Sequence, residues 1–148
     1  IDNDIHGTDL TIGFTTATRI GTMALDRLHS TGDSHHRVMI CELMGRNAGW
    51  LTLASGLASG SDVILIPEIP FDIEKVCAFV EGRKNEHSGF SIVACAEGAH
   101  QIHGEQVVSR HISSSPDPIR LGGIGRQIAS EIEQRTGIET RTTTLGHI

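Results

Sequence analysis

The sequence predicts an α/β fold of three layers, in which a parallel sheet carries helices on both faces. Apolar runs of about five to seven residues alternate along the chain with longer segments of helical periodicity. The short runs are apolar throughout instead of at every second position, which is typical of strands covered on both sides. At 148 residues, the chain is long enough to form one domain with a buried core.

In the first half of the chain, helical periodicity extends from Thr15 to about Ser30, where Thr31-Gly32-Asp33 follows as a stop signal. Two apolar runs in this half are too short for helices and are expected to be buried strands. The expected elements are, in order, a helix at 15–30, a strand at 38–43, a helix at 48–58 and a strand at 62–66.

In the second half, Asp72 precedes a periodic segment as a helix cap, and Gly122-Gly123 leads into another helix that Thr136-Gly137 ends. The expected elements are a helix at 72–84, a strand at 91–96, a helix from 124 to about 135 and a β-branched strand at 140–145. Residues 98–121 contain histidines, serines and two prolines, and we expect them to form an irregular, mobile excursion.

Charge and composition exclude some classes of partner. Lys and Arg total 12 against 18 Asp and Glu, for a net charge of −6, which argues against nucleic acid or an anionic membrane as partner. No apolar run approaches the roughly 20 residues of a membrane span. Three cysteines without CxxC spacing are expected to be reduced core thiols of a cytoplasmic protein.

Polar residues follow three of the expected strands. Met44-Gly45-Arg46 follows the first, Glu97-Gly98 another and Gly146-His147 the last. Because ligands of parallel sheets bind beyond the carboxyl ends of the strands, we expect these residues to converge on one crevice. Arg46 offers a planar donor fork for phosphate, and Glu97 offers acceptors for sugar hydroxyls. The alternatives are a purely structural turn and a solvated carboxylate.

Asp2 and Asp4 form an acidic pair at the start of the chain. In an extended segment they project to the same side, about 6–7 Å apart. Such a pair can share a metal ion, or one carboxylate can hold the metal while the other accepts a proton. The alternative is a solvated acidic turn.

Other polar residues carry weaker signals. Arg37 and Arg141 each lie at the start of an expected strand, at the edge of the sheet opposite to the carboxyl ends. There they could reach a neighbouring subunit, and the alternative is that they are surface charges. His100 and His103 lie in a Ser-, Gly- and Pro-containing loop, so we expect no zinc site there. No GxSxG sequence occurs, and no glycine-rich phosphate loop occurs either, which disfavours a nucleotide-binding module.

Six stretches of the chain form a colinear series of motifs. They are Ile1-Asp2-Asn3-Asp4-Ile5 with Gly7-Thr8-Asp9, Ser34-His35-His36-Arg37, Glu42-Leu43-Met44-Gly45-Arg46-Asn47-Ala48-Gly49, Pro67-Glu68 with Pro70-Phe71, Ala96-Glu97-Gly98, and Glu139-Thr140-Arg141 with Leu145-Gly146-His147-Ile148. Taken together, these stretches resemble motifs of the phosphofructokinase family. Each one alone is moderately specific, but all six in this order are highly specific. Only residues 98–121 are left as a large unmatched region.

The resemblance implies a role for each matching residue in phosphoryl transfer to fructose 6-phosphate. Asp2 would accept the proton of the sugar's 1-hydroxyl, and Asp4 would help to position Mg²⁺. The residues that would bind the sugar phosphate are Met44, Gly45, Arg46, Glu97 and His147. Arg46 would also stabilise the charge of the phosphoryl group during transfer. Arg37 and Arg141 would reach the 6-phosphate of a substrate bound to a neighbouring subunit.

The resemblance also implies that this chain is an internal piece of a larger enzyme. Residues 1–13 would be the edge of the donor-binding subdomain, and residues 14–148 the fructose 6-phosphate-binding subdomain. The glycine-rich donor motifs of the family are missing, so the piece alone is not expected to turn over. We expect a cytoplasmic glycolytic homo-oligomer, a dimer or tetramer, that uses ATP. The alternatives are a pyrophosphate-dependent enzyme and a non-catalytic module for sugar-phosphate binding and oligomerisation.

Overall fold

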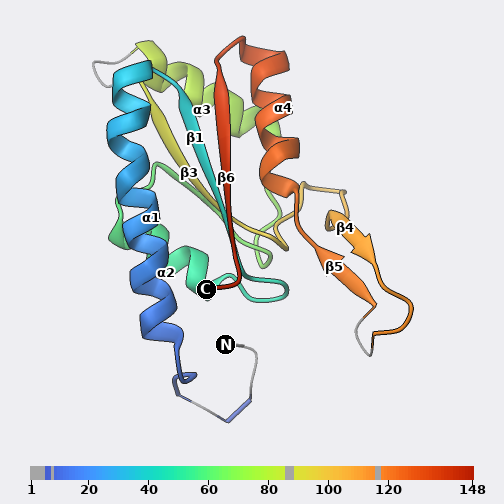
Figure 1. Cartoon of the computed structure of the whole chain (residues 1–148). Coiled ribbons are helices and arrows are strands. Elements are labelled where there is room, and N and C mark those ends of the chain that lie inside the picture. Colours follow the sequence, from blue (N-terminus) through green and yellow to red (C-terminus); the bar gives the residue numbers. More distant parts are fainter. Residues whose placement is uncertain (1–5, 8, 86–88, 116–117) are drawn as a thin grey trace.

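A computed structural model describes residues 6–7, 9–85, 89–115 and 118–148. Its main feature is a parallel sheet between two layers of helices, as predicted (Figure 1). The elements are α1 (Phe14–His35), β1 (Val38–Leu43), α2 (Trp50–Ala58), β2 (Val63–Leu65), α3 (Ile73–Asn85), β3 (Ser91–Ala96), β4 (Val108–His111), β5 (Ile119–Leu121), α4 (Ile124–Thr136) and β6 (Thr140–Gly146).

The four strands of the main sheet lie in the order β2-β3-β1-β6, and all neighbours are parallel. Strand β1 is therefore central, with β3 and β6 on either side of it. The bounds expected for β1 and β3 agree with the structure, since every residue of both strands is buried. A continuously apolar run was thus a reliable sign of a strand covered on both faces.

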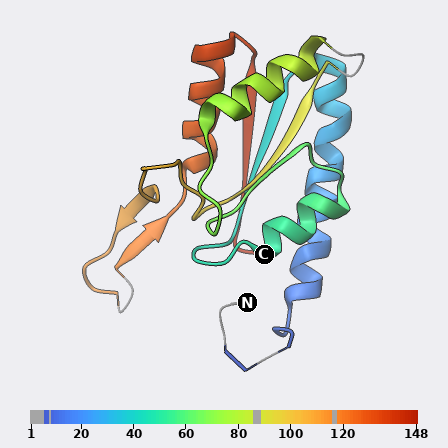
Figure 2. The same cartoon turned by 180° about the vertical axis from the view of Figure 1, so that it is seen from behind.

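The core has two parts, one on each face of the sheet, because alternate residues of a strand point to opposite sides. Val38 and Ile40 of β1 pack in a cluster with residues of α3 and α4. Met39 and Cys41 pack in a second cluster with Leu25 of α1. Both views of the chain show this division, with α1 and α2 on one face and α3 and α4 on the other (Figures 1 and 2).

Helix α1 is longer than expected, and the predicted stop at 31–33 was wrong. Gly32 lies inside the helix and is buried, and a Cβ there would come within 2.9 Å of the Phe90 ring. This glycine therefore allows close packing and does not end the helix. The helix ends at His35, where His36 adopts a left-handed conformation with φ 52° and donates its N–H to the Gly32 carbonyl.

The expectation of an irregular excursion at 98–121 was also wrong in part, because β4 and β5 form an antiparallel pair. This hairpin stands apart from the main sheet in both views (Figures 1 and 2). All four residues of β4 are exposed, so the strand has no buried apolar face that a sequence pattern could reveal.

The cysteines are core residues, as expected. Cys41, Cys77 and Cys95 are free and buried, and burial is the main cause that raises the pKa of each thiol, to about 11 for Cys41. Among the described residues, no helix is both long and apolar enough to cross a bilayer.

Candidate functional site

The loops after β1, β3 and β6 meet at the carboxyl edge of the sheet, as predicted. The backbone N–H of Glu97 donates to the Leu43 carbonyl at 2.9 Å, and the N–H of Gly98 donates to the Gly45 carbonyl at 2.9 Å. On the other side of β1, Gly146 is in register with Leu43. The parallel pairing is thus extended past the strands and brings the three polar loops side by side.

Two glycines make this close approach possible. A Cβ on Gly98 would lie 1.9 Å from the carbonyl oxygen of Arg46, which is far inside contact distance. Gly45 has φ 149°, and a Cβ there would lie 2.9 Å from the Ala48 carbonyl oxygen. The loop that carries Arg46 therefore rests directly on the loop that carries Glu97.

Glu97 is the half-buried carboxylate of this edge, and its electrostatics connect it to the other two loops. Burial raises the pKa of Glu97, and the negative charge of Glu42 also raises it. A hydrogen bond from the Gly45 backbone N–H and the positive charges of His147 and Arg46 lower this pKa. The acceptor that we expected for sugar hydroxyls thus lies within electrostatic reach of Arg46 and His147, two other residues that we expected at this site.

The turn between β1 and α2 is part of the site, but one of its N–H groups is already used. Gly49 precedes α2 and donates its N–H to the Glu68 carboxylate at 2.8 Å. A Cβ on Gly49 would lie 2.4 Å from Cβ of Ile66, so close packing also requires a glycine. Binding of an anion at this turn must therefore rest on Arg46 and the remaining backbone donors. Sequence reasoning did not assign Glu68 this capping role.

Glu42 is a functional-site neighbour whose role sequence reasoning missed. Its side chain is 3% exposed, and its carboxylate accepts the N–H of Gly125 at 2.8 Å and that of Gly123 at 2.9 and 3.1 Å. These N–H groups belong to the beginning of α4, where a negative charge is favourable. The signal was present in the sequence as a single acidic residue inside an otherwise apolar strand.

Gln106 is a third residue whose role the sequence analysis overlooked. Its side-chain amide donates to the carbonyl of Arg46 at 2.7 Å and to the carbonyl of Gly98 at 3.1 Å. It comes from the excursion before β4, and a lone glutamine in a polar segment gives no sequence signal. It joins two of the three loops of the site.

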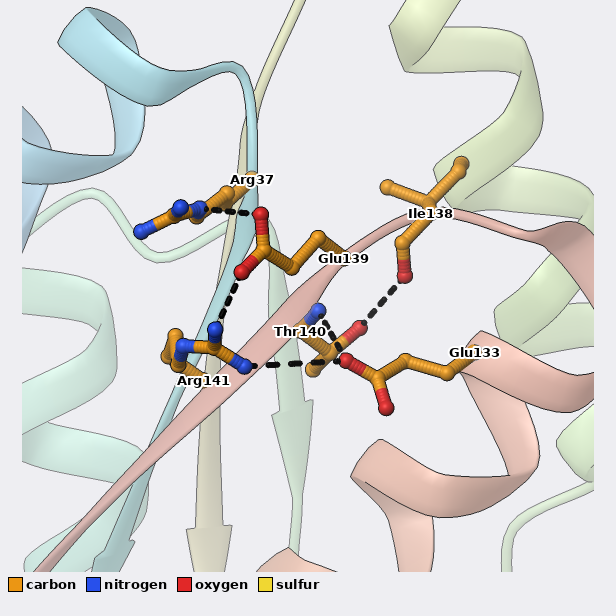
Figure 3. Close-up of polar contacts among 6 residues, drawn as sticks. All are labelled: Arg37, Glu133, Ile138, Glu139, Thr140 and Arg141. Carbon is orange, nitrogen blue, oxygen red and sulfur yellow. Dashed lines mark hydrogen bonds and ion pairs between the residues drawn. The ribbon is translucent and has the colours of Figure 1, made fainter.

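Arg37 and Arg141 lie together at the opposite rim of the sheet, as expected, and share one carboxylate. Nε of Arg37 contacts Oε2 of Glu139 at 2.7 Å, and Nη2 of Arg141 contacts Oε1 of the same residue (Figure 3). Nη1 of Arg141 also lies 4.0 Å from Glu133. Both arginines are part of an ion-pair network on one face, which agrees with a shared site and equally with structural surface charges.

The remaining predicted residues are placed only in part. Met44 is half-buried and follows β1 directly, while His147 is exposed and follows β6. Asp2 and Asp4 lie outside the described residues. Within the residues that the structure describes, no group of three His, Cys, Asp or Glu side chains could hold a metal ion.

The sequence model of phosphofructokinase matches residues 1–148. The chain belongs to the phosphofructokinase family. It is 54% identical to an ATP-dependent 6-phosphofructokinase 2 of Clostridium perfringens, with all of this chain and 41% of the relative covered. It is 51% identical to a pyrophosphate–fructose 6-phosphate 1-phosphotransferase of Streptomyces coelicolor, with all of the chain and 43% of the relative covered. The chain thus spans about two fifths of these relatives.

Solved phosphofructokinase structures have the same fold. The phosphofructokinase of Saccharomyces cerevisiae matches with a TM-score of 0.80 at 34% identity, over 99% of this chain and 18% of that one. A pyrophosphate-dependent phosphofructokinase of Marinobacter aquaeolei matches with a TM-score of 0.76 at 25% identity, over 96% of this chain and 34% of that one. The family and the α/β fold expected from the sequence motifs are therefore confirmed.

Proposed function

We propose that this chain forms the fructose 6-phosphate-binding part and the catalytic edge of an ATP-dependent 6-phosphofructokinase. The supporting observation is the convergence of Arg46, Glu97 and His147 at the carboxyl edge of the sheet, where the pKa of Glu97 responds to both cations. The names of the relatives support the same activity. The reaction is phosphoryl transfer to the sugar's 1-hydroxyl, which gives fructose 1,6-bisphosphate.

The described residues suit the recognition of a sugar phosphate. Arg46 provides paired N–H donors for an anion, and Met44 and Gly45 shape the loop that carries it. Glu97, held by the Gly45 N–H, accepts hydrogen bonds from sugar hydroxyls, and His147 adds a donor from the third loop. Arg46 also stabilises the negative charge that spreads over the phosphoryl oxygens during transfer.

We assign the proton transfer to Asp2, which lies outside the described residues. A carboxylate with an ordinary pKa near 3.9 is ionised at neutral pH and accepts a proton without tuning. The 1-hydroxyl gives its proton to Asp2 as its oxygen attacks the terminal phosphorus, and the bond from that phosphorus to the bridging oxygen breaks to release ADP. Since this transition state is loose, positioning contributes more than base strength.

We assign Mg²⁺ to Asp4 together with the phosphates of the donor. The described residues contain no three-ligand cluster, and Mg²⁺ does not need one, because it is commonly held by one or two carboxylates plus substrate phosphates. The ion supplies charge neutralisation on the donor when bound. Asp4 lies outside the described residues.

We propose a division of the chain at about residue 13. The part before α1 would belong to the edge of the donor-binding subdomain, and residues 14–148 to the subdomain that binds fructose 6-phosphate. The described structure is compatible with this division because the two core clusters draw all their residues from positions 25 and beyond.

We also propose that the complete enzyme is a cytoplasmic glycolytic homo-oligomer, a dimer or tetramer. Arg37 and Arg141 lie at the rim opposite to the carboxyl edge, so they cannot serve the phosphate of their own substrate there. They are available to a neighbour's 6-phosphate if that phosphate competes with Glu139 for their guanidinium groups.

A segment exchange tests the proposed activity. The 148 residues would replace the matching segment of the Clostridium perfringens relative, which aligns with the whole chain. We expect the hybrid to form fructose 1,6-bisphosphate from ATP, and Asp2→Asn to lower kcat by about 10²- to 10⁴-fold, as for loss of a general base. Asp33→Asn, an exposed acid of α1, is the matched control and should leave kcat unchanged.

The same exchange separates the alternatives. A parallel hybrid with the Streptomyces coelicolor relative should use pyrophosphate, since we expect the residues that choose the donor to lie outside this chain. A hybrid that is folded and binds fructose 6-phosphate but transfers nothing would favour the non-catalytic module. A folded hybrid that does not bind the sugar phosphate would refute the proposed function.

A further inference from the structure

We propose that Gln106 is a positioning residue of the sugar-phosphate site, where it clamps the loop of Arg46 onto the loop of Glu97. This inference rests on the proposed function and adds to it a residue outside the family motifs. Gln106 lies in the 98–121 excursion, so the proposal also gives this excursion a role in substrate binding.

The clamp consists of two hydrogen bonds from one side-chain amide. Nε2 of Gln106 lies 2.7 Å from the carbonyl oxygen of Arg46 and 3.1 Å from that of Gly98. The two carbonyls belong to loops that follow different strands and already touch, because the Gly98 N–H donates to the Gly45 carbonyl. The amide of Gln106, which lies in the 98–121 excursion, thus joins the two loops where they touch.

The chemistry of an amide fits this position. A primary amide carries two N–H donors and no charge, which is what two carbonyl oxygens require. A carboxylate of the same shape has no donor and would repel both oxygens, while an apolar side chain of similar size would leave them without this partner. A glutamine is therefore distinguishable from its nearest isosteres at this site.

The backbone that directly follows Gln106 is anchored to the rest of the fold, which helps to hold the clamp in place. The next residue, Val107, packs against the core cluster of β1, α3 and α4. Its carbonyl accepts the N–H of Gly122 at 3.2 Å. Just beyond, the buried carboxylate of Glu42 binds the N–H groups of Gly123 and Gly125. The base of the hairpin is thus tied to the central strand that carries the Arg46 loop.

The hydrogen bond to the Arg46 carbonyl fixes the position of the Arg46 backbone, from which the guanidinium side chain extends. Since the Gly98 carbonyl is held by the same amide, the relative position of Arg46 and Glu97 is fixed before substrate arrives. Groups that are held in place before binding lose less freedom on binding, which strengthens affinity. Gln106 thereby acts on the substrate through Arg46 and Glu97.

Two variants of the 148-residue chain test the clamp, Gln106→Met without donors and Gln106→Glu with a charge. Gln127→Glu, an exposed glutamine of α4, controls for the added charge. In both Gln106 variants, we expect amide hydrogen exchange at Gly98 to be about tenfold or more faster, with exchange at Ile40 in β1 unchanged. We also expect fructose 6-phosphate to bind about tenfold more weakly, from calorimetry.

A pH series provides a signature that a general loss of stability would not produce. Protonation of the Gln106→Glu carboxyl restores one O–H donor at the contact between the two loops. Relative to the unaltered chain at each pH, its affinity for fructose 6-phosphate should therefore recover as the pH falls towards about 5, while that of Gln106→Met should not.

Three results would overturn the clamp. They are unchanged exchange at Gly98 in both variants, faster exchange throughout β1, and sugar-phosphate affinity equal to that of the unaltered chain. If the unaltered chain is folded and oligomeric and still binds no fructose 6-phosphate, the proposed function fails, whereas exchange at Gly98 decides in either case whether Gln106 holds the two loops together.

Discussion

At the scale of single residues, the site depends on backbones that approach more closely than a side chain would allow. Gly98→Ala places a Cβ 1.9 Å from the Arg46 carbonyl oxygen, so one loop must move. We expect a loss of about 1–3 kcal/mol in the free energy of unfolding, as in other overpacked positions, together with loss of fructose 6-phosphate binding. Urea unfolding and calorimetry measure both.

The matched control is Gly82→Ala in α3, at an exposed glycine whose added Cβ meets nothing within 4 Å. This change should stabilise the chain by up to about 1 kcal/mol, because alanine favours a helix over glycine. A Gly98→Ala variant as stable as the unaltered chain would show that the two loops do not pack as described.

Glu97 makes the free energy of unfolding depend on pH. Burial raises the pKa of Glu97 in the folded chain above the ordinary value of 4.5. Well below pH 4.5, the carboxyl is protonated in the folded and in the unfolded chain. Between 4.5 and the raised pKa, the folded chain holds the proton more often than the unfolded chain does. Stability should therefore decrease as the pH rises through the raised pKa of Glu97.

Glu97→Gln has no such titration, so its stability relative to the unaltered chain should increase as the pH rises from about 4 to 7. Urea unfolding of both proteins over this range provides the comparison. Parallel curves would mean that Glu97 is solvated like an ordinary surface carboxylate.

At the scale of elements, a buried carboxylate adds to the apolar packing that holds α4 on the central strand. Glu42→Gln removes the charge that the N–H groups of Gly123 and Gly125 face. We expect a loss of about 1.5–3 kcal/mol in the free energy of unfolding, as for hydrogen bonds to charged groups.

Glu131→Gln, on the same helix, is the control for this change, because Glu131 is paired with Arg135 one turn away. Such a pair contributes about 0.2–0.5 kcal/mol. Equal effects of the two substitutions in urea unfolding would contradict the role of Glu42 in anchoring α4.

The elements also show what could be predicted from the sequence. Strands β1 and β3 were found to the residue because burial on both faces makes them apolar except at Glu42 and Ser91. The hairpin of β4 and β5 was missed because its strands are exposed and its pairing is between residues of the same polar segment.

In the candidate site, the positions of Arg46 and Glu97 were predictable because parallel strands bring their carboxyl ends to one edge of the sheet. Glu68 and Gln106 were not, since each acts by binding a backbone group that only the folded chain brings near. Side chains that support a site through backbone contacts leave no periodic or motif signal in one sequence.

At the scale of the whole molecule, Arg37 and Arg141 connect this chain to the oligomer that we propose. Arg37→Ala in the Clostridium perfringens hybrid should raise KM for fructose 6-phosphate about 10- to 100-fold, from the loss of a charged hydrogen bond, with little change in kcat. Steady-state kinetics measure both constants. An unchanged KM would show that Arg37 does not bind the substrate and only pairs with Glu139 at the surface.

The most direct test of the sugar-phosphate site is an amide NMR titration of this chain with fructose 6-phosphate. We predict saturable shifts at the backbone N–H groups of Gly45, Gly98 and Gly146, which vanish in Arg46→Ala. Three results from a folded, oligomeric chain would contradict the account. The shifts could be absent, could persist in Arg46→Ala, or could occur instead at the cavity of about 300 Å³ beside Gln101 and Gln127.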